Sequence, residues 1–454
     1  MKFIDLSKVQ DVGTSCILAE IGPFNILIDA GLHPKKVGLD ATPDFSKIDD
    51  FSLDYIILTH CHLDHLGSLP LIFNRQQQAL ILASVPSMTL APRMLKNSYQ
   101  VMRRQSEDQH IPGYPLYNRS DINAVEKALI SMAYGETKIF DKKGHRLEVT
   151  FYSSGHIPGA SGCLIKYNHK TIFVTGDVLF DEQYTIPGAK FPQGPFDVLI
   201  METTRGATAR SVENTRKSEM DRLIETINHT IDRRGSCLIP VFALGRMQEL
   251  LALFHTARNE RKLRECPIFC SGLGMDLVDY FETIARKTGL IHFRKKMVTQ
   301  LKVKPLKQNV YPGVDLQEKG IYLLSSGMLI ENTPSYVVAS ALIRHPHNSV
   351  CFVGYCDPDT PGGKLLETPH GKPFLFEALE YADNVRAHVD KFDLTGHADR
   401  EELLNFAITT NPKSIILTHG EPVARQWFET TLAEKLPNTQ IINPVPEKEY
   451  AVYS

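Results

Sequence analysis

The chain has 454 residues, enough for two domains, and its 43% hydrophobic and 22% charged residues are ordinary for a soluble globular protein. No apolar run is long enough to cross a bilayer, which excludes a membrane-spanning class, and the formal net charge of −2 gives no general affinity for polyanions. The sequence begins without a signal-peptide pattern, and its eight cysteines form no CxxC pair. We therefore expect a cytoplasmic protein with buried, reduced thiols.

Short β-rich runs separated by turns occupy residues 14–200 and predict strands of layered sheets. These predicted strands are residues 15–18, 25–28, 55–58, 147–152, 162–167, 171–174 and 197–200. After residue 202 helical and strand-like segments alternate, which predicts a second α/β lobe. The predicted helices of this lobe are 213–233, 245–258, 275–287 and 335–343, and its strands are 237–241, 267–270, 321–324 and 350–355.

Near residue 384 the earlier pattern returns. The predicted elements there are a strand at 385–392, a helix at 400–409, a strand at 414–417 and a helix at 422–435. The simplest arrangement is one domain inserted into another. The predicted domain limits are 1–202 and 384–454 for the two parts of the first domain and 203–383 for the insertion.

Three histidines and a carboxylate lie directly after an apolar strand, in an HxHxDH segment at residues 60–65. Because alternate side chains of an extended chain share a face, His60 and His62 can converge on one metal ion, while a turn lets Asp64 and His65 reach a second. Nitrogen and oxygen ligands without thiolate suit zinc, with manganese or iron as alternatives. The segment therefore predicts a metal site.

Three further residues follow apolar runs in the same way: His156, Asp177 and His419. Each of them alone fits a turn residue beside glycine at least as well as a metal ligand. Taken together with the HxHxDH segment, they complete two metal sites that share Asp177.

These segments resemble, in the same order, the motifs of the metallo-β-lactamase superfamily, which begin here with Asp29 in residues 27–31. The resemblance implies an αββα fold, with Asp29 either supporting the ligands or capping a turn. It also implies two metal ions, two Zn²⁺ with Mn²⁺ as the alternative. The implied ligands are His60, His62 and His156 for the first ion, Asp64, His65 and His419 for the second, and Asp177 for both.

The remainder of the chain resembles the β-CASP branch, which includes nucleases of pre-mRNA 3′-end processing, ribonuclease J and DNA-repair relatives. The segments that carry this resemblance are Glu202 in residues 201–204, the PVFALGR segment at 240–246, SSGML at 325–329, Gly354-Tyr355, His397 in 394–399 and His419 in 418–421. Histidine at the last motif resembles the RNA-processing members. The implied fold class is α/β, a metallo-β-lactamase αββα sandwich with an inserted β-CASP α/β domain.

Three segments depart from the β-CASP pattern. Arg205 replaces the usual tyrosine after the acidic motif, residues 330–332 replace glycines, and residues 359–364 replace a Gly-Thr-x-Gly-Arg type of segment. These changes affect the implied substrate channel and leave the metal ligands intact. The preferred length and end of the substrate therefore stay open.

The function implied by the resemblance is hydrolysis of RNA phosphodiester bonds, with Asp64, Glu202 and His397 as catalytic residues. A hydroxide shared by the two metal ions would attack phosphorus in line, and His397, oriented and kept charged by Glu202, would protonate the leaving oxygen. The products would be a 5′-phosphate and a 3′-hydroxyl. Alternatives are a hydrolase of a small ester or phosphodiester and a non-catalytic scaffold for RNA processing.

Single-stranded RNA is the expected partner, and no membrane partner is expected. Arg246, at the start of a predicted helix, fits a phosphate contact or a buried salt bridge equally well. Ser326 and Lys364 lie in the later motif segments and are also expected to bind substrate. A basic stretch at 294–307 fits a solvated face better than an RNA track. The choice between endonuclease and exonuclease, the preference for RNA over DNA and the presence of a homodimer are left open.

Overall fold

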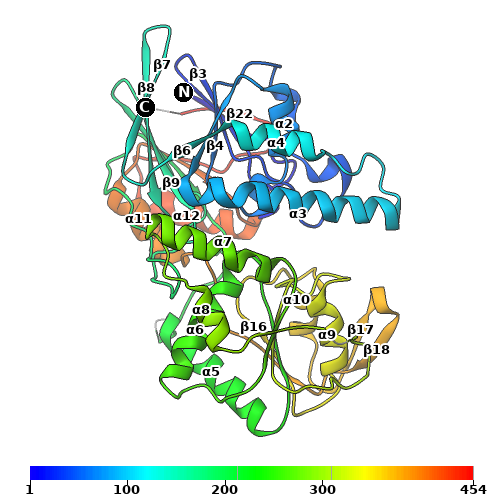
Figure 1. The fold of residues 1–454 in the computed structure, drawn as a ribbon. Helices are drawn as coiled ribbons and strands as arrows, with labels where there is room; N and C mark the ends of the chain where they lie inside the picture. Colours follow the sequence, from blue (N-terminus) through cyan, green and yellow to red (C-terminus); the bar gives the residue numbers. More distant parts are fainter. Residues whose placement is uncertain (212, 308, 453–454) are drawn as a thin grey trace. The chain divides into compact units, whose positions relative to one another are not determined.

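The computed structural model describes residues 1–211, 213–307 and 309–452, and the chain forms two compact units (Figure 1). The first unit consists of Met1–Glu182, Gly188–Arg210 and His397–Ser454. The second unit consists of Gln183–Pro187 and Ser211–Gly396. The first unit is therefore built from segments at both ends of the chain.

Two seven-stranded sheets form the centre of the first unit. In spatial order the first sheet contains β22 (Glu449–Ala451), β1 (Lys2–Asp5), β2 (Ile17–Ile21), β3 (Phe24–Ile28), β4 (Tyr55–Leu58), β5 (Leu80–Ser84) and β6 (Leu129–Met132). The second contains β21 (Gln440–Ile442), β20 (Ser414–Thr418), β11 (Val198–Glu202), β10 (Lys170–Val174), β9 (Ser161–Tyr167), β8 (His145–Ser153) and β7 (Thr137–Lys142). Strands β3 to β6 are mutually parallel, as are β10, β11, β20 and β21, so residues that follow these strands gather at one edge of each sheet.

Helices pack on the outer sides of the two sheets and complete four αββα layers (Figure 1). The helices on the side of the first sheet are α1 (Leu63–Leu66), α2 (Leu69–Arg75), α3 (Val85–Gln109) and α4 (Arg119–Ala128), and those on the second sheet are α11 (Arg400–Thr410) and α12 (Pro422–Lys435). The predicted fold class is thus confirmed. The β-rich pattern does not predict α3, because Pro92 and several polar residues interrupt its apolar periodicity.

Apolar side chains from both sheets meet in the interior of the sandwich. Ile57 and Leu82 of the first sheet belong to the same buried cluster as Val149 and Ile165 of the second. A second cluster lies between the second sheet and α11 and α12, where the ring of Phe173 stacks on Phe196 at a centroid distance of 5.0 Å. These two layers of packing hold the strand ends in place.

A six-stranded parallel sheet forms the centre of the second unit. Its strands are β14 (Lys304–Pro305), β13 (Ile268–Cys270), β15 (Ile321–Leu324), β12 (Cys237–Pro240), β16 (Ser349–Phe352) and β19 (His388–Lys391). The unit also contains the hairpin β17 (Pro373–Phe376) and β18 (Tyr381–Asn384), and helices α5 (Arg216–Asp232), α6 (Arg246–Asn259), α7 (Leu273–Thr288), α8 (Lys295–Gln300), α9 (Pro334–Leu342) and α10 (Pro361–Glu367). The predicted alternation of helices and strands after residue 202 is observed here.

The strand predicted at 385–392 exists as β19. It pairs in parallel with β16, with Val350 opposite Val389, and lies in the sheet of the second unit. Apolar alternation identifies a strand, whereas its sheet depends on contacts with residues far away in the chain. The domain limits 1–202, 203–383 and 384–454 stay predictions, since sequence-defined domains and compact units need not share limits.

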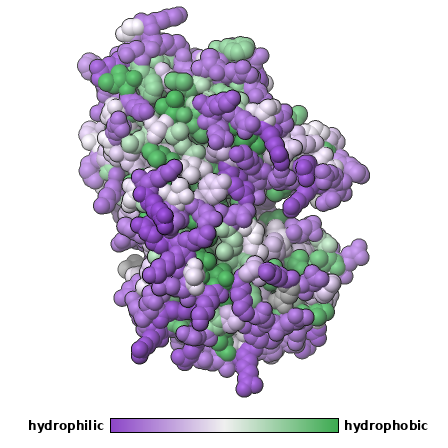
Figure 2. Space-filling model, viewed as in Figure 1, coloured by the Kyte–Doolittle hydropathy of each residue, from purple (hydrophilic) through white to green (hydrophobic). Residues whose placement is uncertain are grey.

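The surface in Figure 2 is mostly hydrophilic, and apolar side chains form small, separate patches on it. Among the described residues, no helix is both long and apolar enough to cross a bilayer. All eight cysteines are free thiols, and seven of them are buried, as the sequence predicts.

Replacing Phe173 by alanine should lower the free energy of unfolding by about 3–5 kcal/mol, because the substitution leaves a cavity among packed aromatic rings. This change is measured by unfolding the whole protein in urea and monitoring the first unit by the fluorescence of its tryptophan and by circular dichroism. Val423→Ala is the control, since Val423 is 69% exposed and should change stability by less than about 0.5 kcal/mol. An unchanged midpoint for Phe173→Ala would contradict the packing described.

Candidate metal centre

The histidines and carboxylates predicted to bind metal lie in loops that follow strands of the two sheets. The HxHxDH segment follows β4 and continues into α1, whose N-cap is His62. His156 follows β8, Asp177 follows β10, and His419 follows β20. The sheet edges therefore bring together seven residues that are up to 359 positions apart in the sequence.

Four of these residues form a first group, with ligand atoms all within 4.8 Å of one another: His60, His62, His156 and Asp177. The Oδ2 atom of Asp177 lies 3.5 Å from His60 Nε2 and 3.7 Å from His156 Nε2. His156 Nε2 lies 3.1 Å from His62 Nδ1. Three imidazoles and one carboxylate oxygen therefore face a common point.

Asp64, His65 and His419 form a second group of the same compactness. Asp64 Oδ2 lies 3.3 Å from His419 Nε2 and 3.9 Å from His65 Nε2. The Oδ1 atom of Asp177 lies 3.4 Å from His65 Nε2 and 3.4 Å from His419 Nδ1. The two carboxylate oxygens of Asp177 thus face different groups, which is the arrangement of a shared ligand.

Three buried atoms of this cluster have no hydrogen-bond partner within the described part of the chain: His60 Nε2, His65 Nε2 and Asp177 Oδ1. Buried polar atoms normally have a partner, because leaving one without a hydrogen bond costs free energy. All three atoms belong to the two groups of imidazoles and carboxylates, a ligand set that suits a tetrahedral zinc ion. The residues therefore fit a pair of transition-metal ions.

Electrostatic interactions within the cluster favour a neutral His60 and ionised Asp64 and Asp177, the forms of these three side chains that bind metal. Burial lowers the pKa of His60 well below its usual value, and the neighbouring His65 adds to this effect, which keeps His60 neutral. Burial would raise the pKa of Asp64, but its hydrogen bond with His419 and the charge of His65 lower it to about 2. Burial also opposes the ionisation of Asp177, yet the surrounding histidines hold its pKa well below the usual range.

Asp29 orients one of the metal-facing histidines. Its Oδ2 atom accepts hydrogen bonds at 2.7 Å from both His65 Nδ1 and Thr59 Oγ1, and its Oδ1 atom accepts one from the Thr59 amide. With Nδ1 engaged, His65 presents Nε2 to the cluster. The nearby Gly31 is required by space, because a Cβ atom there would lie 1.8 Å from the carbonyl oxygen of Asp64.

Glu202 and His397 form a pair beside the two ligand groups. His397 Nδ1 lies 3.0 Å and 3.2 Å from the two carboxylate oxygens of Glu202, and the His397 ring lies 4.6 Å, centroid to centroid, from that of His156. Burial would lower the pKa of His397, but the negative charge of Glu202 raises it above the usual value. The pair therefore favours the protonated imidazole of His397 next to the candidate metal centre.

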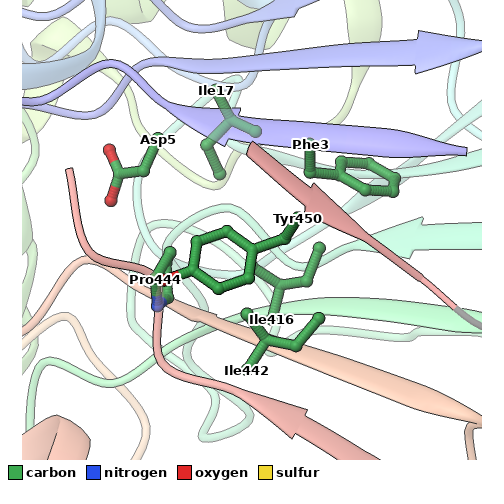
Figure 3. A pocket seen from close by; sticks show the side chains of 7 residues that line it. All are labelled: Phe3, Asp5, Ile17, Ile416, Ile442, Pro444 and Tyr450. Carbon is green, nitrogen blue, oxygen red and sulfur yellow. The ribbon is translucent and has the colours of Figure 1, made fainter. Parts of the chain in front are cut away.

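Arg425 has a structural role at the metal centre that the sequence does not predict. Its guanidinium is fully buried and donates hydrogen bonds to the carbonyl oxygens of Leu417 (3.2 Å) and Gly420 (2.9 Å), on either side of His419. His419 has a φ of 49°, a left-handed conformation that needs such support. Asp5 Oδ2 lies 3.7 Å from Arg425 and lines a small cavity between the two sheets (Figure 3).

None of the metal-facing residues lines the cavity in Figure 3, whose walls are mainly apolar. The cavity therefore does not extend the metal centre. The lining residues are Phe3, Asp5, Ile17, Ile416, Ile442, Pro444 and Tyr450.

The three residues predicted to bind substrate lie in the second unit. Arg246 is the buried first residue of α6, and its guanidinium donates to Gln183 Oε1 at 3.3 Å. Burial and the nearby Arg216 lower the pKa of Arg246 to about 9. Ser326 Oγ accepts a hydrogen bond from the Ile330 amide, while Lys364 is exposed and lies 3.9 Å from Glu377 Oε1.

Three family models match most of the chain. The model of the metallo-β-lactamase superfamily matches residues 9–216, that of the β-CASP domain matches 247–365, and that of the Zn-dependent metallo-hydrolase RNA specificity domain matches 383–444. The last match begins before β19, which lies in the second compact unit.

Several curated proteins are similar along nearly the whole chain. The probable RNase MJ4 of Methanocaldococcus jannaschii is 27% identical, over 94% of this chain and 96% of that protein. The transcription termination factor FttA of Pyrococcus horikoshii is 29% identical, over 93% of this chain and 66% of its own length. The endoribonuclease ysh1 of Schizosaccharomyces pombe is 27% identical, over 97% of this chain and 57% of its own length.

A solved structure of a protein of unknown function from Enterococcus faecalis has the same fold, with a TM-score of 0.54 and 11% identity over 99% of both chains. Fold, ligand cluster and family models together define a metallo-hydrolase. The chain belongs to the β-CASP branch of the metallo-β-lactamase superfamily.

Replacing Asp177 by alanine should remove most of the bound metal, because both ligand groups lose an oxygen and their histidines lose a neighbouring negative charge. Inductively coupled plasma mass spectrometry of gently purified protein measures the metal content. The control is Asp181→Ala, which removes a partly exposed carboxylate paired with Arg210 and should keep the wild-type content. Equal metal in the Asp177 variant and the wild type would contradict the shared-ligand arrangement.

Proposed function

We propose that the protein is a metal-dependent ribonuclease that hydrolyses phosphodiester bonds of single-stranded RNA with two zinc ions. The observation that carries this proposal is the Asp177 carboxylate, whose oxygens face two separate histidine groups, with His397 and Glu202 beside them. The match to an RNA specificity domain and the names of the relatives, a probable RNase and an endoribonuclease, support RNA as the substrate. Manganese is the alternative metal.

In this proposal the ligands are assigned to the two ions as the family resemblance implies. The first ion takes His60, His62 and His156, the second takes Asp64, His65 and His419, and Asp177 is shared. When bound, such ions lower the pKa of water and neutralise charge on the phosphoryl oxygens. Asp64 also counts among the catalytic residues, because its carboxylate is the only one besides Asp177 in the two ligand groups.

His397 is proposed as the general acid. Its Nδ1 atom faces Glu202, which orients the ring and favours the imidazolium, so that Nε2 can give a proton to the leaving 3′-oxygen. Val178 donates its amide hydrogen to Glu202 Oε1 at 2.6 Å, which fixes the carboxylate. The resulting products are a 5′-phosphate and a 3′-hydroxyl.

Substrate binding by Arg246, Ser326 and Lys364 stays a proposal. The guanidinium of Arg246 donates to the amide oxygen of Gln183 at 3.3 Å and not to a carboxylate oxygen there, which favours an anion contact over the salt bridge considered from sequence. In the basic stretch, Lys295 and Lys304 each lie 2.6 Å from a carboxylate oxygen, of Asp279 and Glu318, which favours a solvated face. The choice between endonuclease and exonuclease action and the presence of a homodimer stay open, and the cytoplasmic location stays a prediction.

The proposal is tested with RNA and DNA single strands labelled at either end, incubated with the zinc- or manganese-loaded protein. We expect metal-dependent cleavage of RNA that Asp64→Ala abolishes. His397→Ala should retain its metal and lose about 10²- to 10⁴-fold in kcat, since a general acid contributes about that factor. Full activity of His397→Ala would remove it from the mechanism.

The position of the label in the products distinguishes endonuclease from exonuclease action. Failure to cleave any strand with metal bound would favour a hydrolase of small esters or phosphodiesters. Less than one metal ion per chain in the wild type would favour the scaffold.

Replacing Lys364 by glutamine should raise KM for RNA with little change in kcat. The slope of log affinity against log salt concentration should become less steep by about 0.7, the contribution of one phosphate contact to a single strand. Fluorescence anisotropy with labelled RNA at several salt concentrations measures the slope. The matched control is Lys304→Gln, which removes an ammonium already paired with Glu318. Equal slopes for the Lys364 variant and the wild type would exclude this contact.

A further inference from the structure

The hydroxyl group of Thr204 lies between the two halves of the candidate active centre. Its Oγ1 atom is 2.5 Å from Glu202 Oε2 and 3.0 Å from His419 Nδ1. All three side chains are at least nine-tenths buried. One hydroxyl therefore contacts both the carboxylate that holds His397 and a proposed ligand of the second metal ion.

The hydrogen-bonding capacity of a hydroxyl determines the direction of these two contacts. A threonine has one hydroxyl hydrogen, and the acceptor-only carboxylate of Glu202 at 2.5 Å is its nearest acceptor. The contact with His419 Nδ1 must then use a lone pair of Oγ1, so the imidazole is the donor. His419 accordingly carries its hydrogen on Nδ1 and leaves the Nε2 lone pair for a metal ion.

The position of Nε2 agrees with this tautomer. His419 Nε2 lies 3.3 Å from Asp64 Oδ2, within the second ligand group. The arrangement parallels that of His65, whose Nδ1 donates to Asp29 while its Nε2 faces the same group. His419 Nδ1 also lies 3.4 Å from Asp177 Oδ1, and the Thr204 hydroxyl at 3.0 Å is its nearer, neutral partner.

We infer that Thr204 is a positioning residue that fixes the tautomer of His419 for the second metal ion and links this ligand to the Glu202–His397 pair. The inference rests on the two-metal centre of the proposed function and does not depend on RNA being the substrate. In this link His397 Nδ1 contacts the carboxylate of Glu202, and the Thr204 hydroxyl donates to the same carboxylate. His419 Nδ1 in turn donates to the Thr204 hydroxyl. Removing the hydroxyl takes away a donor to Glu202 Oε2 and the nearest partner of His419 Nδ1.

The test is titration of the metal-free protein with zinc in competition with a chromophoric chelator, with no RNA present. Thr204→Val keeps the shape of the side chain and removes the hydroxyl. It should weaken the binding of one of the two ions by about 10- to 100-fold, the usual effect of losing an outer partner of a histidine ligand, and leave the other ion unchanged. Thr204→Ser restores the hydroxyl and should bind both ions with affinities within about threefold of the wild type.

Thr203→Val is the matched control, because Thr203 is also buried and its hydroxyl donates to the carbonyl oxygen of Thr418 at 3.0 Å without contacting an imidazole. It should retain both affinities. Wild-type zinc affinities in Thr204→Val would overturn the inference, as would an equal loss in Thr203→Val or in Thr204→Ser. Absence of RNA cleavage by the wild type would count against the proposed function and leave these zinc affinities interpretable.

Discussion

Two groups of histidines lie against one another in the interior of this protein, and the Asp177 carboxylate is the interaction that makes this arrangement stable. Its two oxygens face the two groups at 3.4–3.7 Å, so one buried negative charge serves both. Without it, imidazoles brought this close would repel one another whenever they were protonated. The same carboxylate is the shared ligand of the proposed two-metal centre, so the electrostatic stability of the cluster and the proposed metal chemistry depend on one side chain.

The αββα sandwich supplies the geometry that this interaction requires. Strand β4 is parallel to β5, and β10 and β20 are both parallel to β11, so the loops that follow β10 and β20 leave the second sheet at the same edge. Hydrogen bonds from outside the ligand groups reach two of the rings. Asp29 acts on His65 and Thr204 on His419, and Arg425 supports the backbone on both sides of His419.

The second unit differs from the first in how its charged residues are used. Two lysines of its basic stretch, Lys295 and Lys304, have carboxylate partners on the surface, which reduces the net positive charge of the stretch. Arg246 is buried at the start of α6 with a glutamine as its acceptor, which is an unusual place for a guanidinium. Recognition of a polyanion by this unit would thus depend on a few residues, in agreement with the net charge of −2.

The sequence by itself determined the local features: the HxHxDH spacing, the strands before each ligand, and the αββα class through its family resemblance. Covalent geometry places such neighbours together, whatever the rest of the chain does. Only the tertiary structure decided that β19 joins the second unit and that Arg425 supports His419. It also decided the contact between Thr204 and His419, residues 215 positions apart, because hydrogen bonds between distant segments depend on how whole sheets pack and have no signature in local spacing.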